Sequence, residues 1–398
     1  MKKVYLAILL LTATEGGFNT IFPPYLQQAR YPVEQIGMIV ALFAVLQLAA
    51  RLPAGALYVG KAKPLFVAFV LLFIAGTGGF AYEGGTPYLI ALTMAHGFAF
   101  GGIGTVMLAW AIELKPQNST HGATMGWYTA ALSAGYSIGN FCGGYLADSL
   151  GYALTFVVVG LVPSISILAG LTLPTPSVPL VPSVPSEAEP KRRRRMELRE
   201  LQELISPNLA LATLIAIYLN ILDDGFATFF PLFALGTGLS LTFIGLLKSV
   251  KSLTATLLRP LAGGIFRYIN FKTLNNLLIV TWAVVIVLLP SLRAEWMFFL
   301  VFITIGVCRG LLRVTSATML AEEKAKETGG IGIASAVYNA GLDIGGFAGP
   351  LIAGYVASVT DIPTMFRVVP VALLATYLLA AVWVERAGVK RASMMRET

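Results

Sequence analysis

The chain alternates long apolar runs with short polar segments. Each apolar run is about 20 residues long or more, the length that an α-helix needs to cross roughly 30 Å of hydrocarbon. The pattern predicts twelve transmembrane helices, at residues 4–26, 34–58, 63–82, 87–112, 122–147, 151–173, 208–235, 241–266, 271–292, 294–317, 328–357 and 362–385. The first run ends without a small-residue cleavage site, so we expect a membrane helix there rather than a signal peptide.

The composition agrees with a polytopic membrane protein. Of the 398 residues, 57% are hydrophobic and 12% are charged, and the mean hydropathy is +0.77, whereas soluble domains carry about 25% charged residues. The two cysteines and two histidines provide no spacing for a disulfide framework or a metal site. Since the sequence shows neither a phosphate-binding loop nor a nucleophile–base set, we expect no cofactor and no enzymatic activity.

The basic residues predict how the helices are oriented. With both termini in the cytoplasm, most of the 28 Lys and Arg residues fall on the cytoplasmic side, and only Arg30, Arg293 and Arg367 fall in outer loops. This distribution follows the positive-inside rule. We therefore expect a multi-pass protein of the cell (inner or plasma) membrane with both termini cytoplasmic. The net charge of +8 then requires no nucleic-acid partner.

One long polar segment divides the chain. Residues 174–205 contain repeated prolines, which keep a linker extended, followed by the basic run Lys191–Arg195. Met196–Leu204 is predicted to form a short amphipathic helix on the cytoplasmic face. The basic run anchors the topology or binds anionic lipid, and the linker as a whole is a tether or a regulatory element. The predicted units are thus residues 1–173, the linker 174–205, and residues 206–398.

The two units repeat one another. A shift of 208 residues places Glu15–Pro23 on Asp223–Pro231, with the acid, Gly, Phe, Thr, Phe and Pro all coinciding, and it also places Arg51 on Arg259. Matches of Gly and Ala are common by chance in membrane helices, but an acid, an arginine and a proline matched by one ungapped shift are not. The repeat predicts two pseudo-symmetric six-helix bundles that rock against each other about an axis along the membrane normal.

Two further matches support the repeat. His96-Gly97 in the fourth helix corresponds to Arg309-Gly310 in the tenth. The glycines of the fifth helix, among them Gly135, Gly139 and Gly143, recur 206 residues later in the eleventh. Small residues at this spacing allow helices to approach closely. They provide either smooth faces on which the two halves slide or static packing positions.

With these features the chain resembles the major facilitator superfamily over nearly its whole length. Twelve helices, a long charged loop after the sixth, and the repeat all fit. The segment Pro53–Lys63 keeps the proline, the Gly55 and the bases of that family's signature between helices two and three, with Val59 in place of its aspartate. The second copy, Pro260–Arg267, also lacks the aspartate.

Among members of that family, the pattern is closest to drug/proton antiporter-type efflux proteins. The glycines of the fifth helix resemble their signature, although Asn140–Cys142 departs from its Gly-Pro step. The arginine that those antiporters often carry in the fourth helix is absent, and the nearby polar residue is His96. In the resembled fold, helices one, four, seven and ten line a central cavity.

Charged residues inside the predicted helices are candidates for function. A charge at the bilayer centre costs about 3 to 17 kcal/mol depending on how it is assessed. The four acids are the candidates for proton coupling: Asp223, Asp224, Glu15 and Asp343. Each charge is either part of a buried ion pair that fixes helix packing or a carrier of protons or substrate. Only Glu15 lies in the first half, so coupling is expected mainly in the second.

The positions of other residues in the predicted helices suggest two further groups of candidates. The candidates for substrate binding are Asn19, Phe22, Tyr25, His96, Asn220, Lys248, Lys251, Arg309 and Asn339. The candidates for gating near the cytoplasmic ends are Arg51, Gly55, Arg259, Gly263 and Arg313.

The sequence supports one function and leaves others open. We expect a monomeric secondary active transporter that exports a small organic molecule by alternating access, coupled to protons or to sodium, with membrane lipid around it. One alternative is an organic-anion transporter that uses Lys248, Lys251 and Arg309 as ligands. Another is a lipid or glycolipid flippase or a non-transporting membrane scaffold.

Overall fold

The structure, a computed structural model, describes residues 1–58, 61–114, 121–173, 207–258, 271–324 and 331–397. All regular elements in these ranges are helical. The first half contains α1 (Lys2–Gln28), α2 (Val33–Leu57), α3 (Ala62–Gly78), η1 (Gly79–Ala81), α4 (Thr86–Glu113), α5 (His121–Leu161) and α6 (Pro163–Leu171). The second contains α8 (Pro207–Gly236), α9 (Leu241–Leu258), α11 (Phe271–Leu288), η2 (Leu289–Ser291), α12 (Glu295–Lys324), α13 (Ile331–Val359) and α14 (Ile362–Glu397). The predicted linker, with its helix Met196–Leu204, lies outside the described residues.

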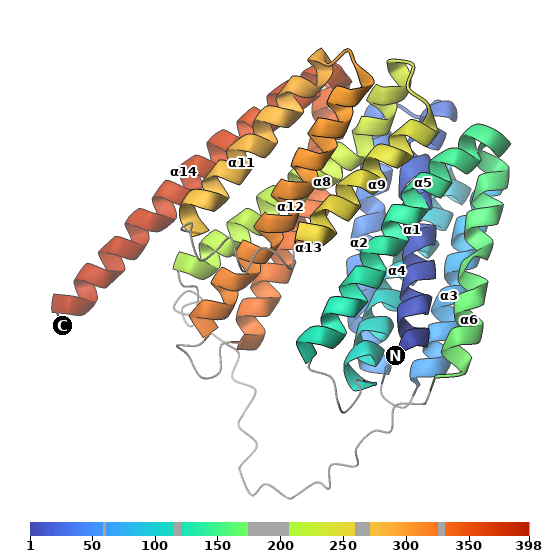
Figure 1. Cartoon of the computed structure of the whole chain (residues 1–398), viewed down its shortest axis with the longest axis horizontal. Helices are drawn as coiled ribbons and strands as arrows, with labels where there is room; N and C mark the ends of the chain where they lie inside the picture. Colours follow the sequence, from blue (N-terminus) through green and yellow to red (C-terminus); the bar gives the residue numbers. More distant parts are fainter. Residues whose placement is uncertain (59–60, 115–120, 174–206, 259–270, 325–330, 398) are drawn as a thin grey trace, which may run out of the picture.

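The described helices account for twelve membrane crossings. Eleven helical stretches are long and apolar enough to span a membrane, and one of them covers the 48 residues Thr124–Leu171. As one straight helix that stretch would be about 70 Å long, over twice the hydrocarbon thickness. It is divided at Gly151, whose φ of 76° and ψ of 170° reverse the chain. Figure 1 shows the chain rising along α5 and returning along α6, so this stretch crosses twice.

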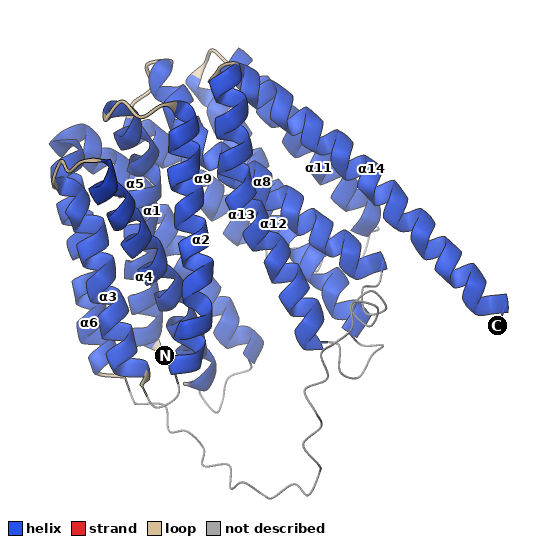
Figure 2. Ribbon diagram, turned by 180° about the vertical axis from the view of Figure 1, so that it is seen from behind, coloured by secondary structure: helices blue, strands red, loops and turns tan. Residues whose placement is uncertain are grey.

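The two halves use the same helix pairs. In the first half α1 packs along α5, and in the second α8 packs along α13. Between the halves, α5 packs on α9 and α2 on α13, which is again one pairing seen twice. Figures 1 and 2 show the halves meeting at one end and diverging toward the end that carries the N-terminus. We call these the closed end and the open end.

The hydrophobic core explains this shape. A large cluster of buried residues runs from the first half, through Phe22 and Ile36, into the second half at Leu241 and Phe229. A separate cluster, which includes Val4 and Trp110, lies toward the open end within the first half alone. Apolar burial therefore joins the two halves at the closed end, where separating them would expose that surface.

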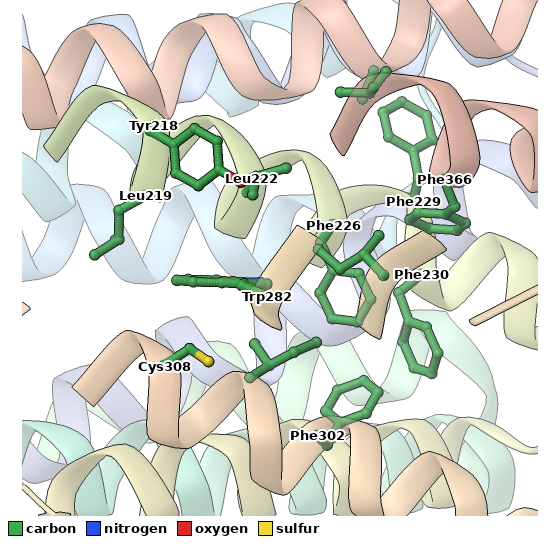
Figure 3. Packing of buried hydrophobic residues seen from close by; sticks show 14 of the residues in the cluster. Tyr218, Leu219, Leu222, Phe226, Phe229, Phe230, Trp282, Phe302, Cys308 and Phe366 are labelled. Atoms are coloured by element: carbon green, nitrogen blue, oxygen red, sulfur yellow. The ribbon is translucent and has the colours of Figure 1, made fainter. Parts of the chain in front are cut away.

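Aromatic side chains fill the core of the second half. Phe226, Phe230 and Phe302 lie against one another, with Trp282 nearby on α11 (Figure 3). The rings of Phe230 and Phe302 meet edge to face with centroids 4.6 Å apart. Such packing holds α8, α11 and α12 as one body.

The start of α9 ties the halves together through hydrogen bonds. The Asp148 carboxylate of α5 accepts the Leu241 amide at 3.2 Å and the Thr242 amide at 2.7 Å. It also accepts the Thr242 hydroxyl at 2.6 Å, while Ser240 caps the Phe243 amide from within the second half. Since the first amides of a helix have no partner inside the helix, a carboxylate is well placed there. Asp148 thus fastens the closed end.

The glycine stripes pack helices inside each half. A Cβ on Gly135, Gly139 or Gly143 would overlap α1, and one on Gly345 or Gly349 would overlap α8. Of the two roles that the sequence left open, the structure therefore supports static packing for these stripes. The close approaches between halves involve other glycines, namely Gly37 against Pro350, Gly144 against Leu241 and Gly245 against Asn140.

A substitution at Gly139 tests this packing. A Cβ there would overlap the Ala13 carbonyl oxygen, so Gly139→Ala must push α1 away from α5. We expect a lower melting temperature in detergent, corresponding to about 1–3 kcal/mol of overpacking. Gly126→Ala on the same helix is the control, because nothing lies within 4 Å of its Cβ position. Equal melting temperatures for the two variants would contradict the assignment.

Candidate functional site

The deep charges lie halfway along the helices, in one group within each half. Glu15 is at the midpoint of α1 and Asp223 is near the midpoint of α8, each about 20 Å from its helix ends. His96 on α4 and Arg309 on α12 lie beside them. The expected cavity helices therefore do bring charged side chains to mid-depth, and α9 adds Lys248 and Lys251.

Asp223 is held by two cations. Lys251 Nζ donates to Oδ1 at 2.7 Å, and Arg309 Nε donates to Oδ2 at 2.9 Å. Asp223 and Lys251 are almost fully buried, whereas the Arg309 side chain is 33% exposed. The group carries one net positive charge, which requires a further anion close by.

Asp224 supplies that anion. It is half-buried on the next position of α8, and its Oδ2 lies 3.2 Å from where a Cβ on Gly346 of α13 would stand. Its backbone carbonyl accepts from the Thr228 hydroxyl at 2.7 Å, but among the described residues its carboxylate has no hydrogen bond or ion pair within bonding distance. Asp224 is therefore a half-buried carboxylate beside a cationic group, without a dedicated partner among the described residues.

The first half contains a pair related to Asp223–Arg309 by the repeat. His96 Nε2 lies 3.0 Å from Glu15 Oε2, and both side chains are at most 1% exposed. The Asn19 amide donates to Glu15 Oε1 at 2.8 Å. The Thr77 hydroxyl lies 2.9 Å from His96 Nδ1. Residues that the repeat aligned, Glu15 with Asp223 and His96 with Arg309, thus form the same contact in each half.

Aromatic rings enclose this pair. The Phe18 ring stacks on His96 with centroids 3.8 Å apart, and Phe73 and Phe43 lie 4.7 and 5.3 Å from it. His96 is therefore a buried partner of Glu15 in this structure, and the predicted role of His96 as a substrate ligand would require the packing to open.

Lys248 links the two halves at mid-depth. Its Nζ crosses from α9 and donates to the Asn19 carbonyl of α1 at 2.8 Å. Within the described part of the chain it has no carboxylate at salt-bridge distance, although it is only 6% exposed. A buried ammonium with one carbonyl partner keeps two donor hydrogens for another group.

A second link lies closer to the open end. Arg51 of α2 donates to Asp343 of α13 at 3.0 Å, with side-chain exposures of 44% and 17%. On α12, Arg313 reaches Asn220 at 3.4 Å, and the Asn220 amide donates to the Leu342 carbonyl at 2.7 Å. Asp343, predicted as a proton carrier, and Arg51, predicted in gating, are thus partners across the halves.

The remaining candidates are dispersed. Phe22 is buried against Phe18, and Tyr25 packs against Phe156. Asn339 is exposed on α13, and Gly55 is exposed on α2. Arg259 and Gly263 lie outside the described residues. No three His, Cys, Asp or Glu side chains within the described ranges are grouped as a metal site would require.

Sequence reasoning missed several polar contacts. Thr77 completes the His96 group, but a threonine in an apolar helix carries no distinguishing signal. The same holds for Asp148 at a helix end, and for Ser137 and Ser249, whose hydroxyls bond the backbone of each other's helices between α5 and α9. Each depends on which helices face each other in space. The repeat did carry a signal for the Glu15–His96 pair, because it aligned both members with an acid–base pair.

Comparison with known proteins agrees with this architecture. A family model described as the Major Facilitator Superfamily matches residues 4–340. The chain belongs to the Major Facilitator Superfamily. The twelve-helix fold expected from the sequence is thereby confirmed, and the chain is a member of a family of multi-pass membrane transporters.

Relatives in the superfamily are distant. An uncharacterized MFS-type transporter of Methanocaldococcus jannaschii is 22% identical over 400 residues, which cover 97% of this chain and 99% of that protein. The crystal structure of a bacterial homolog to the human lysosomal transporter Spinster, inward-facing and unoccupied, has a TM-score of 0.76 at 14% identity, with 98% and 96% of the two chains covered. The nucleoside transporter NupG has a TM-score of 0.75 at 12% identity, with 96% and 98% covered. At such identities the structures share the fold alone.

The Asp223 group can be tested by stability. Asp223→Ala leaves the buried Lys251 and the half-buried Arg309 without their carboxylate, so we expect a loss of about 3–5 kcal/mol, read as a lower melting temperature. Adding Lys251→Met removes one of the stranded cations. The double variant should therefore melt above the single one, and a double variant that melts lower would contradict the pairing.

The closed-end tie can be tested by accessibility. Ser249→Cys, in a background of Cys142→Ser and Cys308→Ala, places a reporter at a position that is 6% exposed. Asp148→Ala removes three hydrogen bonds worth about 1 kcal/mol each, so labelling by an impermeant thiol reagent should accelerate about a hundredfold. Ser240→Ala is the control, because it removes a cap inside the second half only. Equal acceleration in both variants would show that Asp148 acts only as a helix cap.

Proposed function

We propose that this chain is a proton-coupled secondary transporter that exports a small organic molecule by alternating access, in the manner of drug/proton antiporter-type members of its superfamily. The observation that carries the proposal is Asp224, a half-buried carboxylate without a dedicated partner beside the Asp223–Lys251–Arg309 group. A carboxyl group in such a place can either hold a proton or release it and balance the positive charge of the neighbouring cations.

The geometry supports an exchange mechanism. With Asp224 ionised, its charge balances the net positive charge of the Asp223 group. Protonation removes that balance and leaves Arg309, whose guanidinium is 33% exposed, in need of another anionic or polar partner. A substrate and a proton would thus influence each other's binding through Arg309, which is the linkage that coupled transport needs.

The basic residues of the loops support an orientation. With both termini cytoplasmic, the open end faces the cytoplasm, so the described state is inward-facing and closed toward the outside. Outward opening then requires the closed end to separate, including the Asp148 contacts with α9. We propose that the chain works as a monomer in the cell membrane with a proton, rather than sodium, as its coupling ion.

An organic-anion transporter is the second candidate. Free cations lining the cavity would favour it, but Asp223 engages Lys251 and Arg309. Lys248 is the observation in its favour, since within the described residues its ammonium bonds a carbonyl only. The remaining predicted alternative is a lipid or glycolipid flippase or a non-transporting membrane scaffold. An apolar groove of about 410 Å³ between α5 and α9, at Ile138, Phe141 and Leu253, is the feature that suits a lipid substrate.

Reconstituted protein tests the proposal. Candidate substrates are first selected by thermal shift across organic cations, anions and neutral compounds. Their flux is then measured in proteoliposomes with and without an imposed pH gradient. We expect gradient-driven flux in the native chain, and its loss by tenfold or more in Asp224→Asn, because the amide cannot release a proton.

Asp224→Glu is the matched control and should retain a response to the gradient, since it keeps the carboxyl group. Flux that ignores the gradient in the native chain, or an undiminished response in Asp224→Asn, would contradict the proposal. Flux that is selective for anions and lost in Lys248→Met would favour the second candidate.

A further inference from the structure

The Glu15–His96 contact raises a question about hydrogen atoms. The Thr77 hydroxyl has one hydrogen, and two acceptors lie within its reach: the Phe73 carbonyl at 2.8 Å and His96 Nδ1 at 2.9 Å. On the other side of the ring, His96 Nε2 lies 3.0 Å from Glu15 Oε2. Asn19 donates to the other oxygen, Oε1, so a proton on Glu15 would be on the atom that faces His96.

Two arrangements place a hydrogen in both contacts of the His96 ring, and they differ in whether the Thr77 hydroxyl donates to the Phe73 carbonyl. In the first, Thr77 donates to the Phe73 carbonyl, His96 Nδ1–H donates to Thr77, and a further proton is shared between Nε2 and Oε2. In the second, Thr77 donates to a bare Nδ1, and Nε2–H donates to the Glu15 carboxylate. The first arrangement contains one more proton than the second.

A third combination, with a neutral Nδ1-protonated His96 beside an ionised Glu15, is unfavourable. A neutral His96 with its hydrogen on Nδ1 would turn the Nε2 lone pair toward an ionised Glu15 oxygen only 3.0 Å away. Two acceptors without a hydrogen between them repel each other in a buried site. The tautomer of His96 is therefore coupled to the proton count of the pair.

We infer that Glu15 and His96 form a proton-binding site of their own in the first half, with the Thr77 hydroxyl as the rotor that lets the pair take up and release one proton. No heavy atom has to move between the two arrangements, because only a hydroxyl turns and the imidazole hydrogens change place. The role of this site in transport rests on the proposed function, but its proton binding does not.

The groups around Glu15 and His96 determine the effect of the proton on the rest of the protein. The loaded pair is neutral overall and the unloaded pair carries one negative charge, enclosed by Phe18 and Phe73. The ionisable groups that face the pair from other helices are Tyr136 of α5, which interacts electrostatically with Glu15, and Lys248 of α9, which reaches the Asn19 carbonyl. The unloaded charge therefore lies on α1, the same helix whose Asn19 carbonyl accepts the Lys248 ammonium of the opposite half.

This arrangement links the proton to the position of the halves. Loss of the proton strengthens the attraction between α1 and Lys248, and uptake of the proton weakens it. The equivalent pair in the second half cannot behave in this way, since Arg309 keeps its charge at all physiological pH values. The repeat has therefore produced one acid–guanidinium pair and one acid–imidazole pair at equivalent positions.

Histidine NMR tests the inference directly. The chain has two histidines, so His121→Gln leaves His96 as the sole source of imidazole signals. ¹⁵N-histidine spectra of the full chain in nanodiscs, over about pH 4.5 to 9, report which ring nitrogens carry hydrogen. We expect hydrogen on Nδ1 at low pH and on Nε2 alone at high pH. A single tautomer across the whole range would overturn the inference.

Thr77 variants separate the rotor from a packing role. Thr77→Ser retains the hydroxyl and should retain the change of tautomer. Thr77→Val retains the shape and removes the hydroxyl, so the midpoint of the change should move by at least one pH unit, which is tenfold in proton affinity. An unaltered midpoint in Thr77→Val would overturn the role of Thr77, and Glu15→Gln should abolish the change altogether.

Combining this titration with the flux assay keeps the two proposals apart. Proton-driven flux together with a fixed His96 tautomer would overturn the inference and leave the proposed function standing. A change of tautomer without proton-driven flux would overturn the proposed function and leave the proton site standing. A change of tautomer with coupling weakened in Thr77→Val, and preserved in Thr77→Ser, supports both.

Discussion

The cost of placing charge at the centre of a membrane constrains the whole structure. An ion at that depth requires a partner or water, and this chain meets the requirement by pairing its deep charges with one another inside each half. Asp223, Lys251 and Arg309 neutralise one another only in part, so Asp224 completes the balance. Since α9, which carries Lys248 and Lys251, also packs on α5 across the junction of the halves, motion of the halves alters the electrostatic balance.

Pseudo-symmetry gives the two halves the same framework and different chemistry. The same helix pairs are packed by glycine stripes in each half, and the acid–base contact at the centre is repeated. One copy pairs a carboxylate with a guanidinium and the other pairs a carboxylate with an imidazole. A duplicated architecture thereby supplies a fixed charge on one side and an exchangeable proton on the other, with Lys248 reaching between them.

The sequence was sufficient to predict the fold because the bilayer dictates the length and apolar character of each helix and the side on which basic loops lie. The repeat also predicted that Glu15 and His96 occupy positions equivalent to Asp223 and Arg309. It could not predict Thr77 or Asp148, since each acts on a residue brought near only by packing. It also could not tell whether the glycines face within a half or between halves, because helical spacing is the same in both cases. Expectations for Phe22, Tyr25 and His96 as cavity residues likewise depended on helix rotation, and in this state they are packed inside the first half.

The continuous apolar core at the closed end has a thermal consequence. Opening that end would bring buried surface around Ile36 and Leu241 into contact with water, which raises the heat capacity. The free-energy difference between the inward-facing and outward-facing conformations must then depend non-linearly on temperature. Cooling weakens the apolar contacts that hold the closed end together. Hydrogen bonds such as those of Asp148 follow a different dependence, so the balance between the two conformations shifts with the temperature at which the membrane operates.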